Sequence, residues 1–416
     1  MSKYIINGKN PLKGEVKIHG AKNAVLPVLA AAVVSGEESI IKNCPDLSDV
    51  SESMEILRFL GCDTELKEGT AYINSKNLIT DEVPEDLMLK MRSSVIFLGA
   101  LIARCKSGRV SLPGGCEIGP RPIDLHLKAF REMGIKIEES GGIISCDASN
   151  IKSANVHLDF PSVGATENIM LAATGAKGIT KITNAAKEPE ILDLQNYLLK
   201  AGFNVSGAGT DTVYIEGSAR GKKTSHSIIP DRIEAATYMC AVLMTGGRAE
   251  LNSVCPEHMW AFLSAIKDCG AEVSIKDGSV LIDGRNRLKA VKRILTQPYP
   301  GFPTDMQSVF MSLMTLADGT SVIIENIFKD RFRHVDGLVR MGADIVTDGN
   351  VAIIRGVKGL SGAHVSANDL RGGAALTIAA LAAEGESVIE NLCYIDRGYE
   401  KFEENLSLLG ADIQRK

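Results

Sequence analysis

The hydrophobic and polar positions of this chain repeat six times in succession, about every 70 residues. Each repeat contains a segment of small apolar residues, a short β-branched segment, an amphipathic segment that ends at a glycine, and two alternating segments. These periods predict a buried helix, a strand, an amphipathic helix and a β-hairpin. The closing glycines are Gly61, Gly134, Gly202, Gly270, Gly342 and Gly410. A spacing this regular indicates one structural unit copied in series.

The apolar helices have no polar face, which is typical of helices that are buried on every side. Three such helices inside each half of the molecule, with the strand pairs outside, would give an inverted α/β arrangement whose sheets face outward. The predicted helices contain "NAVLPVLAAAVV", "SSVIFLGALIA", "TENIMLAATG", "IEAATYMCAVLM", "DMQSVFMSLMTLA" and "GGAALTIAALAA".

The length of 416 residues predicts two domains, because a single core rarely grows so large. The last repeat stops at "GADIQRK", one strand short, whereas the amino terminus carries a hairpin-like pair, "YIINGKNPLKGEVKI", with no repeat in front of it. We therefore expect the amino-terminal strands to complete the sixth repeat. This closure predicts a discontinuous domain of residues 1–20 and 230–416 and a continuous domain of residues 21–229. Pro230 is the expected crossing point.

Composition narrows the class of protein. Hydrophobic residues make up 45% and charged residues 23%, which is typical of a soluble globular protein. The net charge of −5 argues against a nucleic-acid-binding surface. The nine cysteines are an odd number without a Cys-x-x-Cys pair, which favours a reducing cytoplasm. This cysteine pattern and the seven dispersed histidines argue against a metal site. The polar amino terminus and the short apolar stretch 24–34 predict neither export nor membrane insertion.

The first turns of the apolar helices carry residues that the repeat does not need. Four of these turns hold a cation, Lys22, Arg92, Arg232 or Arg371. A cation there is unfavourable by about 0.3–1 kcal/mol, because the start of a helix carries partial positive charge. A phosphate or carboxylate bound at these ends would explain the pattern, since both the dipole and the side chain favour an anion. The alternative is that each cation leans into water or pairs with an aspartate.

The second repeat has extra length in the segment "PGGCEIGPRPIDLHL". Its glycines allow backbone conformations that are closed to other residues, and its prolines stiffen the backbone between them. Such a loop suits a lid. The loop presents Cys116, and Arg121 five residues later would favour a thiolate or an anionic ligand. The alternative for Cys116 is a small buried hydrophobe, which is our interpretation of the other eight cysteines.

Two aspartates at helix starts and one arginine are further candidates. Asp305 follows a Pro/Gly-rich approach in "YPGFPTDMQS", and Asp369 lies in "SANDLRGGAAL". Either carboxylate has two interpretations: favourable electrostatics in a first helical turn, or a base that removes a proton from a substrate hydroxyl. Arg397 precedes Gly398, which suggests a close approach of backbones.

These segments together resemble the enolpyruvyl transferase family from end to end. The motifs that carry the resemblance are "GAKNAVLP", "MRSS", "PGGCEIGPRPIDLHL", "SVGATENIM", "PDRIEA", "YPGFPTDMQ", "SANDLRGGAAL" and "IDRGYE". The family implies a two-domain inside-out α/β barrel built from six repeats, three per domain, with the active site in the interdomain cleft. It also implies transfer of the enolpyruvyl group of phosphoenolpyruvate to the 3-hydroxyl of UDP-N-acetylglucosamine, with release of phosphate, as the first committed step of peptidoglycan synthesis.

The resemblance assigns roles residue by residue and implies neither a cofactor nor a metal. By similarity, Cys116 is the proton donor, forms a covalent adduct with phosphoenolpyruvate and is alkylated by fosfomycin, Asp305 is the base, and Asp369 assists proton movement. The implied phosphoenolpyruvate contacts are Lys22, Arg121 and Arg397, with Arg92 and Arg371 alongside. The implied nucleotide-sugar contacts are Asn23, Arg121, Pro122, Ile123, Asp124, Leu125, Ser162, Val163, Gly164, Asp305 and Ile327.

Two alternatives stay open at this stage. The nearest is the shikimate-pathway sibling, which uses shikimate 3-phosphate as the acceptor and lacks the cysteine lid, so "PGGCEIGPRP" argues against it. The other is a catalytically silent paralogue that binds nucleotide sugars as a regulator, against which the retention of Lys22, Cys116, Asp305 and Arg397 argues.

Overall fold

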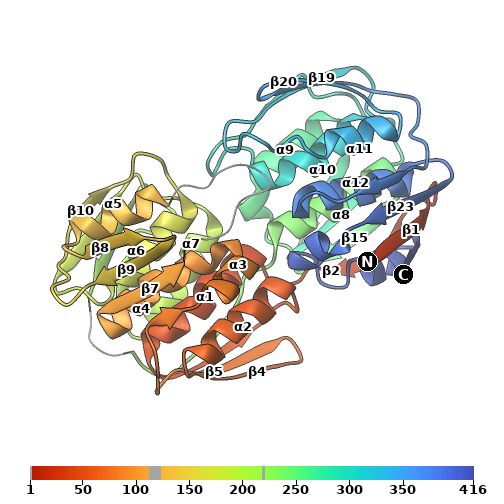
Figure 1. Cartoon of the computed structure of the whole chain (residues 1–416). Helices are drawn as coiled ribbons and strands as arrows, with labels where there is room; N and C mark the ends of the chain where they lie inside the picture. Colours follow the sequence, from red (N-terminus) through yellow and green to blue (C-terminus); the bar gives the residue numbers. More distant parts are fainter. Residues whose placement is uncertain (1, 112–122, 218–220) are drawn as a thin grey trace. The chain divides into compact units, whose positions relative to one another are not determined.

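The computed structural model of the protein describes residues 2–111, 123–217 and 221–416 (Figure 1). This described part of the chain divides into two compact units. The carboxy-terminal unit comprises residues 2–19 and 230–416, and the amino-terminal unit comprises residues 20–111, 123–217 and 221–229.

The six apolar helices form the interior of the two units, as their sequences predict. In the amino-terminal unit, α1 (Lys22–Ser35), α4 (Ile96–Cys105) and α6 (Val163–Ala173) pack against one another. In the carboxy-terminal unit, the same packing joins α8 (Arg232–Met244), α10 (Thr304–Met314) and α12 (Leu370–Ala382). Almost every residue of these helices is buried. Each of the six helix starts therefore belongs to a rigid core element.

The second helix of each repeat is amphipathic and covers this core. These helices are α2 (Ser48–Phe59), α5 (Asp124–Glu132), α7 (Pro189–Lys200), α9 (Trp260–Asp268), α11 (Val335–Arg340) and α13 (Phe402–Leu408). Shorter helical segments are α3 (Glu85–Lys90), η1 (Arg92–Val95), η2 (Pro256–Met259) and η3 (Leu392–Arg397). The predicted closing glycines follow the amphipathic helices, with φ between 78° at Gly134 and 100° at Gly61. Only glycine adopts this backbone region without strain, which explains why each helix ends there.

The described residues form six four-stranded sheets, three in each unit. Those of the amino-terminal unit are β14 (Thr224–Ser227), β3 (Glu38–Lys42), β5 (Thr70–Asn74) and β4 (Asp63–Lys67); β6 (Glu82–Val83), β7 (Ser107–Ser111), β9 (Ile143–Asp147) and β8 (Lys136–Ser140); and β10 (Asn155–His157), β11 (Ile179–Thr183), β13 (Thr212–Glu216) and β12 (Asn204–Ser206). Those of the carboxy-terminal unit are β2 (Lys13–Lys17), β15 (Arg248–Asn252), β17 (Ser279–Asp283) and β16 (Glu272–Lys276); β18 (Arg293–Leu295), β19 (Thr320–Ile324), β21 (Val351–Arg355) and β20 (Asp344–Asp348); and β22 (His364–Ser366), β23 (Glu386–Glu390), β1 (Lys3–Asn7) and β24 (Asp412–Arg415).

The sequence pattern predicts three strands of each sheet and misses the fourth in five of the six sheets. Each missed strand lies parallel to its neighbour, as β10 does beside β11 and β18 beside β19. The missed strands are short, down to the two residues of β6, so alternation has no room to show. One of them, β14, follows the third repeat in the chain and joins the sheet of the first repeat.

The expectation that both amino-terminal strands complete the sixth repeat is wrong for the second strand. β1 does so, pairing antiparallel with β23 and β24. β2 instead lies parallel to β15, in the sheet of the fourth repeat. The two strands are therefore not a hairpin. Alternation shows that each strand has one buried face, but it does not identify the partner strand.

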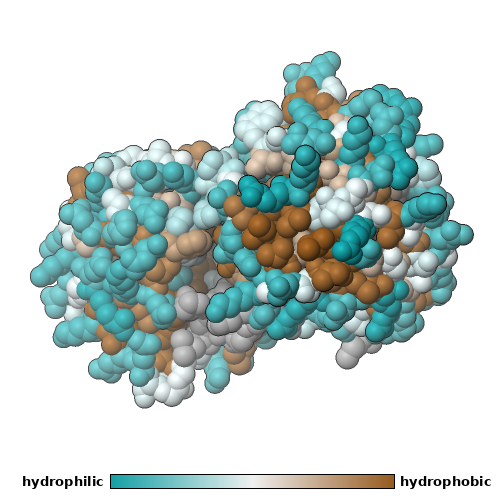
Figure 2. All heavy atoms as spheres, turned by 90° about the horizontal axis from the view of Figure 1, so that it is seen from above, coloured by the Kyte–Doolittle hydropathy of each residue, from teal (hydrophilic) through white to brown (hydrophobic). Residues whose placement is uncertain are grey.

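The sheets turn one face to solvent, as an inside-out arrangement requires. Large apolar side chains on this face are partly exposed, among them Tyr72 of β5, Tyr214 of β13 and Val346 of β20. In Figure 2, hydrophilic side chains cover much of the face seen, and apolar side chains gather in separate patches. No helix in the described part of the chain is both long and apolar enough to cross a membrane.

Candidate active site

In the amino-terminal unit, Lys22 begins α1 and forms a buried ion pair. Its Nζ lies 2.7 Å from Oδ2 of Asp49 in the first turn of α2. Asp49 is 1% exposed and Lys22 is 8% exposed. The sequence allowed the alternative that a helix-start cation pairs with an aspartate, and Lys22 forms such a pair. Asn23, the next residue of α1, is half-buried beside it.

Two segments expected to contact a nucleotide sugar lie beside each other in this unit. Ile123 caps α5, and Asp124 and Leu125 form its first turn. Ser162 caps α6, where its Oγ accepts a hydrogen bond from the backbone N–H of Ala165 at 3.3 Å. Val163 and Gly164 follow Ser162. A methyl group added at Gly164 would lie 3.5 Å from Cε1 of His126, so the two segments are in contact.

His126 fixes the relation between these segments. Its Nδ1 accepts a hydrogen bond from the side-chain amide of Asn168 at 2.9 Å, and the amide oxygen of Asn168 accepts from the backbone N–H of Gly99 at 2.7 Å. Burial lowers the pKa of His126 to about 4, so the ring is neutral. A neutral, fully buried linkage of α4, α5 and α6 gives these segments a rigid support.

A buried carboxyl group of this unit was missed by sequence reasoning. Glu167 lies in α6 and is 7% exposed. Burial raises the pKa of Glu167 well above its ordinary value, and the charges of Glu190 and Glu188 raise it further. These surroundings thus favour the protonated form of Glu167.

In the carboxy-terminal unit, two arginines hold Asp305 in the first turn of α10. Nη2 of Arg331 donates to Oδ1 at 2.8 Å, and Nη2 of Arg371 donates to Oδ2 at 3.2 Å. Both arginine side chains are 3% exposed, whereas that of Asp305 is 24% exposed. The carboxylate of Asp305 is therefore partly open to solvent, while the two buried guanidinium groups fix its orientation.

Arg331 is a second site residue that the sequence did not single out. Its Nη2 also donates to the backbone carbonyl of Thr304, which ties the turn before α11 to the start of α10. In the sequence it stands in "FKDRFRHVDG", where three cations at alternate positions give no sign of which one is buried. Only the tertiary structure distinguishes it.

The backbone around Ile327 is fixed by Glu325. Oε1 of this buried carboxylate accepts from the N–H groups of Ile327 and Phe328, at 2.8 and 3.1 Å. Its Oε2 accepts from the hydroxyl of Thr304 at 3.0 Å. The expected contact residue Ile327 is thereby linked to the helix start that carries Asp305.

Asp369 is the cap of α12. Its Oδ1 accepts hydrogen bonds from the backbone N–H groups of Arg371 and Gly372, each at 3.0 Å. Of the two interpretations that the sequence allowed for Asp369, a favourable charge at a helix start is therefore present in the structure. Its other oxygen, Oδ2, is buried and has no hydrogen-bond partner among the described residues.

Arg397 ends η3, close to the start of α12. A methyl group added at the next residue, Gly398, would lie 2.8 Å from Cδ2 of Leu370. The group that approaches Gly398 is the side chain of Leu370, so the expected close approach of two backbones is not what the structure shows. The ring of Tyr399 lies 5.7 Å from the guanidinium of Arg371, and its hydroxyl bonds to that of Thr237 at 2.9 Å. These contacts hold η3, α12 and α8 together.

Arg232 and Arg92 are the two remaining cations at helix starts. Arg232 is buried at the start of α8, with its guanidinium 5.5 Å from the ring of Tyr299. Arg92 begins η1, and its side chain lies outside the described part of the structure. Lys22, Arg232 and Arg371 are thus each held by a carboxylate or an aromatic ring.

The loop that carries Cys116, the expected proton donor, lies outside the described residues. Cys116, Arg121 and Pro122 all lie outside the described residues. Of the other eight cysteines, most are buried, but Cys393 is exposed and Cys105 and Cys255 are partly exposed, so reading all eight as buried was wrong. The short η3 turns Cys393 outward, a direction that no sequence period reveals. Burial raises the pKa of Cys62, Cys146 and Cys269 to about 12, which keeps these thiols protonated.

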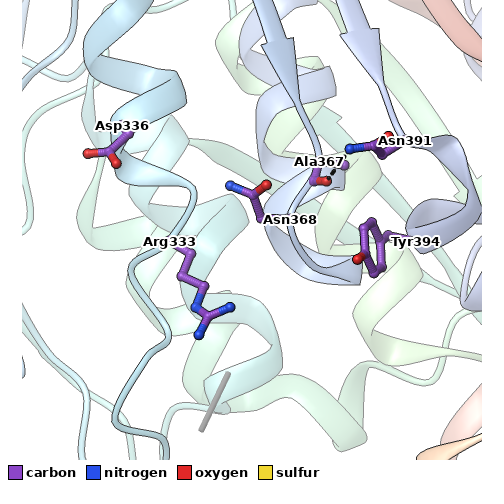
Figure 3. A pocket seen from close by; sticks show the side chains of 6 residues that line it. All are labelled: Arg333, Asp336, Ala367, Asn368, Asn391 and Tyr394. Carbon is purple, nitrogen blue, oxygen red and sulfur yellow. Dashed lines mark hydrogen bonds between the residues drawn. The ribbon is translucent and has the colours of Figure 1, made fainter. Parts of the chain in front are cut away.

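A cavity of about 320 Å³ adjoins the Asp369 region in the carboxy-terminal unit. Its lining comes from the approach to α11, from the residues before α12 and from η3 (Figure 3). The lining residues are Arg333, Asp336, Ala367, Asn368, Asn391 and Tyr394. Asn368 precedes Asp369, and Tyr394 lies on the same short helix as Arg397, so the cavity lies beside the candidate site.

The fold and the arrangement of these groups define an enolpyruvyl transferase, and the chain belongs to that family. The family model of EPSP synthase (3-phosphoshikimate 1-carboxyvinyltransferase) matches residues 6–406. The solved enolpyruvyl transferase NikO from Streptomyces tendae has the same fold, with a TM-score of 0.91 at 23% identity, covering 100% of this chain and 99% of NikO. The family and the fold class expected from the motifs are therefore confirmed.

Curated relatives narrow the family further. The chain is 50% identical over 415 residues to UDP-N-acetylglucosamine 1-carboxyvinyltransferase 2 of Caldanaerobacter subterraneus subsp. tengcongensis, covering 100% of both chains. It is 48% identical over 416 residues to UDP-N-acetylglucosamine 1-carboxyvinyltransferase 1 of Carboxydothermus hydrogenoformans, covering 100% of this chain and 98% of that protein. Both likenesses extend from end to end.

Proposed function

We propose that the protein transfers the enolpyruvyl group of phosphoenolpyruvate to the 3-hydroxyl of UDP-N-acetylglucosamine and releases phosphate. The names of the full-length relatives support this acceptor over shikimate 3-phosphate. The observation that carries the chemistry is Asp305, a partly exposed carboxylate at a helix start whose two oxygens are bound by Arg331 and Arg371.

The proposed reaction is an addition followed by an elimination. The thiol of Cys116 protonates the terminal vinyl carbon of phosphoenolpyruvate, so the adjacent carbon becomes electrophilic. The sugar hydroxyl attacks that carbon while Asp305 accepts its proton, which gives a tetrahedral intermediate. Loss of a proton from the new methyl group and breakage of the bond to the phosphate oxygen then restore the double bond. Asp369 assists these proton movements.

The charges of phosphoenolpyruvate require several cations. We assign its binding to Lys22, Arg121 and Arg397, with Arg92 and Arg371 alongside. Arg371 supports the assignment, because Nη1 of its buried guanidinium has no hydrogen-bond partner within the described part of the chain. A donor held in this way is suited to an incoming carboxylate or phosphate oxygen.

The nucleotide sugar is assigned to groups around three helix starts. These are Asn23, Arg121, Pro122, Ile123, Asp124, Leu125, Ser162, Val163, Gly164, Asp305 and Ile327. Contact between the α5 and α6 starts, and the backbone at Ile327 fixed by Glu325, support preformed binding segments. Preformed segments lower the ordering cost of binding.

The proposed reaction uses no metal and no cofactor, and we place it in the cytoplasm, where both substrates are soluble. Neither nucleic acid nor a membrane takes part in it. Fosfomycin is the expected covalent inhibitor, because its epoxide would be opened by the Cys116 thiolate.

A phosphate-release assay tests the proposal. The enzyme is mixed with phosphoenolpyruvate and UDP-N-acetylglucosamine, with shikimate 3-phosphate, or with no acceptor. Phosphate release that depends on UDP-N-acetylglucosamine is the expected result. Release with shikimate 3-phosphate alone would overturn the acceptor, and binding of both substrates without turnover would favour a silent paralogue.

A further inference from the structure

His334 is a buried polar residue that the proposed mechanism does not use. It lies directly before α11 and is 2% exposed. Neither ring nitrogen makes a hydrogen bond of normal geometry within the described residues, although the backbone of Arg331 lies close enough to the ring to raise its pKa. A buried polar group without a partner destabilises the folded state, so its presence needs a reason.

The nearest reason is Asp369. Its Oδ1 is occupied by the helix cap, whereas Oδ2 is buried and without a partner in the described part of the chain. A methyl group added at Gly372 would lie 2.6 Å from Oδ2 of Asp369 and 3.0 Å from Cβ of His334. The two side chains therefore border the same point, and the missing side chain of Gly372 leaves it open.

The charge state of His334 suits a donor rather than a cation. Burial lowers the pKa of His334 to about 4, although the carboxylate of Asp369 acts in the opposite direction, and the cation of Arg331 lowers it further. The ring is thus neutral near pH 7. A neutral imidazole offers one N–H donor and one acceptor.

The two carboxylates of this unit consequently have different surroundings. Asp305 is bound by the guanidinium groups of Arg331 and Arg371, which stabilise its charged form. Asp369 is bound by backbone N–H groups and borders a neutral ring. Different surroundings allow two carboxylates to take separate roles in proton transfer.

We propose that His334 is a positioning residue for Asp369, donating a ring N–H to Oδ2 when the site is loaded. This hydrogen bond fixes the direction of the carboxylate without adding a positive charge. The inference rests on the proposed function, because Asp369 acts on a proton there.

Two substitutions of His334 distinguish the effect of its N–H donor from the effect of its ring volume. His334→Phe keeps a ring but removes both nitrogens, and His334→Gln keeps an N–H donor. We expect His334→Phe to lower kcat by about tenfold, the effect of one lost hydrogen bond, with each KM within about twofold of wild type. His334→Gln should recover most of kcat. His364→Phe, at an exposed histidine of β22, is the matched control and should be neutral.

A double-mutant cycle tests whether the effect passes through Asp369. In the background of Asp369→Asn, His334→Phe should lower kcat no further. An equal fall of kcat in both backgrounds, a change confined to KM, or full activity of His334→Phe would overturn the proposal.

A measurement that does not depend on turnover is needed in case the wild type is inactive or His334→Phe does not fold. Nitrogen-15 shifts of the His334 ring are compared between wild type and Asp369→Asn at pH 7, each with UDP-N-acetylglucosamine bound. A changed shift supports the pair, and unchanged shifts overturn it. An active wild type without the pair would sink this inference alone, whereas an inactive wild type with the pair would sink the proposed function alone.

Discussion

Nζ of Lys22 lies 2.7 Å from Oδ2 of Asp49, and both side chains are buried at the start of their helices. The aspartate supplies the negative charge that the start of α1 favours, at the position where we place an anionic substrate. Lys22 therefore has two tasks, one in the stability of the amino-terminal unit and one in binding.

Substitution of Lys22 separates these tasks. Lys22→Ala should weaken use of phosphoenolpyruvate, seen as a fall in kcat/KM of about 30-fold or more, while nucleotide-sugar binding changes little. It should also cost about 3 kcal/mol of stability, because the buried carboxylate of Asp49 loses its ion pair with Lys22. The double variant Lys22→Ala with Asp49→Ala should regain thermal stability but not phosphoenolpyruvate use. Equal losses for both substrates would show that the assignment of this helix start is wrong.

The thiol of Cys116 is tested by alkylation. Cys116→Ser should reduce turnover at least about 100-fold and abolish covalent labelling by fosfomycin in mass spectrometry. Cys116→Asp should keep part of the activity, since a carboxylic acid also donates a proton, and should resist the drug. Cys393→Ser removes an exposed thiol and is the control, expected to label fully. Undiminished labelling of Cys116→Ser would refute the role.

Asp305 is tested by removing its charge alone. Asp305→Asn should lower kcat at least about 100-fold, because the amide cannot accept the hydroxyl proton. Binding of phosphoenolpyruvate should not weaken, since Arg331 and Arg371 lose their competing anion. Asp336→Asn changes an exposed carboxylate on the cavity rim of the same unit and should stay within about twofold of wild type. Near-normal turnover of Asp305→Asn would remove it as the base.

Glu167 predicts how stability depends on pH. Its pKa is raised in the folded state, so its favourable contribution is complete below the unfolded pKa near 4.5 and is lost as pH rises through the folded value. Glu167→Gln removes this loss. We expect its Tm to exceed that of wild type at pH 8 by about 2–4 °C for each kcal/mol regained, and the gain to vanish near pH 4.5. Glu132→Gln, at an exposed position of α5, is the control, and a gain that is the same at both pH values would contradict the prediction.

The repeat made most of the architecture predictable. A fixed period exposed the helices without a polar face and the glycines that end the amphipathic helices, because both depend on local sequence. The parallel edge strands were missed because strands as short as β6 have no measurable period. The placement of β2 was wrong because it depends on a partner more than 200 residues away in the chain.

The candidate site was predictable only where a helix start marked it. Lys22, Asp305, Asp369 and Arg371 stood out because charge at these positions is either unusual or capping. Arg331 gave no such signal, because its burial beside Asp305 arises from tertiary packing of the turn before α11. The catalytic and binding roles assigned to all these residues stay predictions.

The pairing of β1 between β23 and β24 has a consequence for the order of events during synthesis. Lys3 and Lys416 exchange backbone hydrogen bonds of 2.8 and 2.9 Å, so β1 finds its neighbours only after β23 and β24 have been synthesised. Until then the nascent chain carries an unpaired strand ahead of a half that can already fold. The same adjacency means that a short peptide linker could join the two ends and let the chain begin elsewhere.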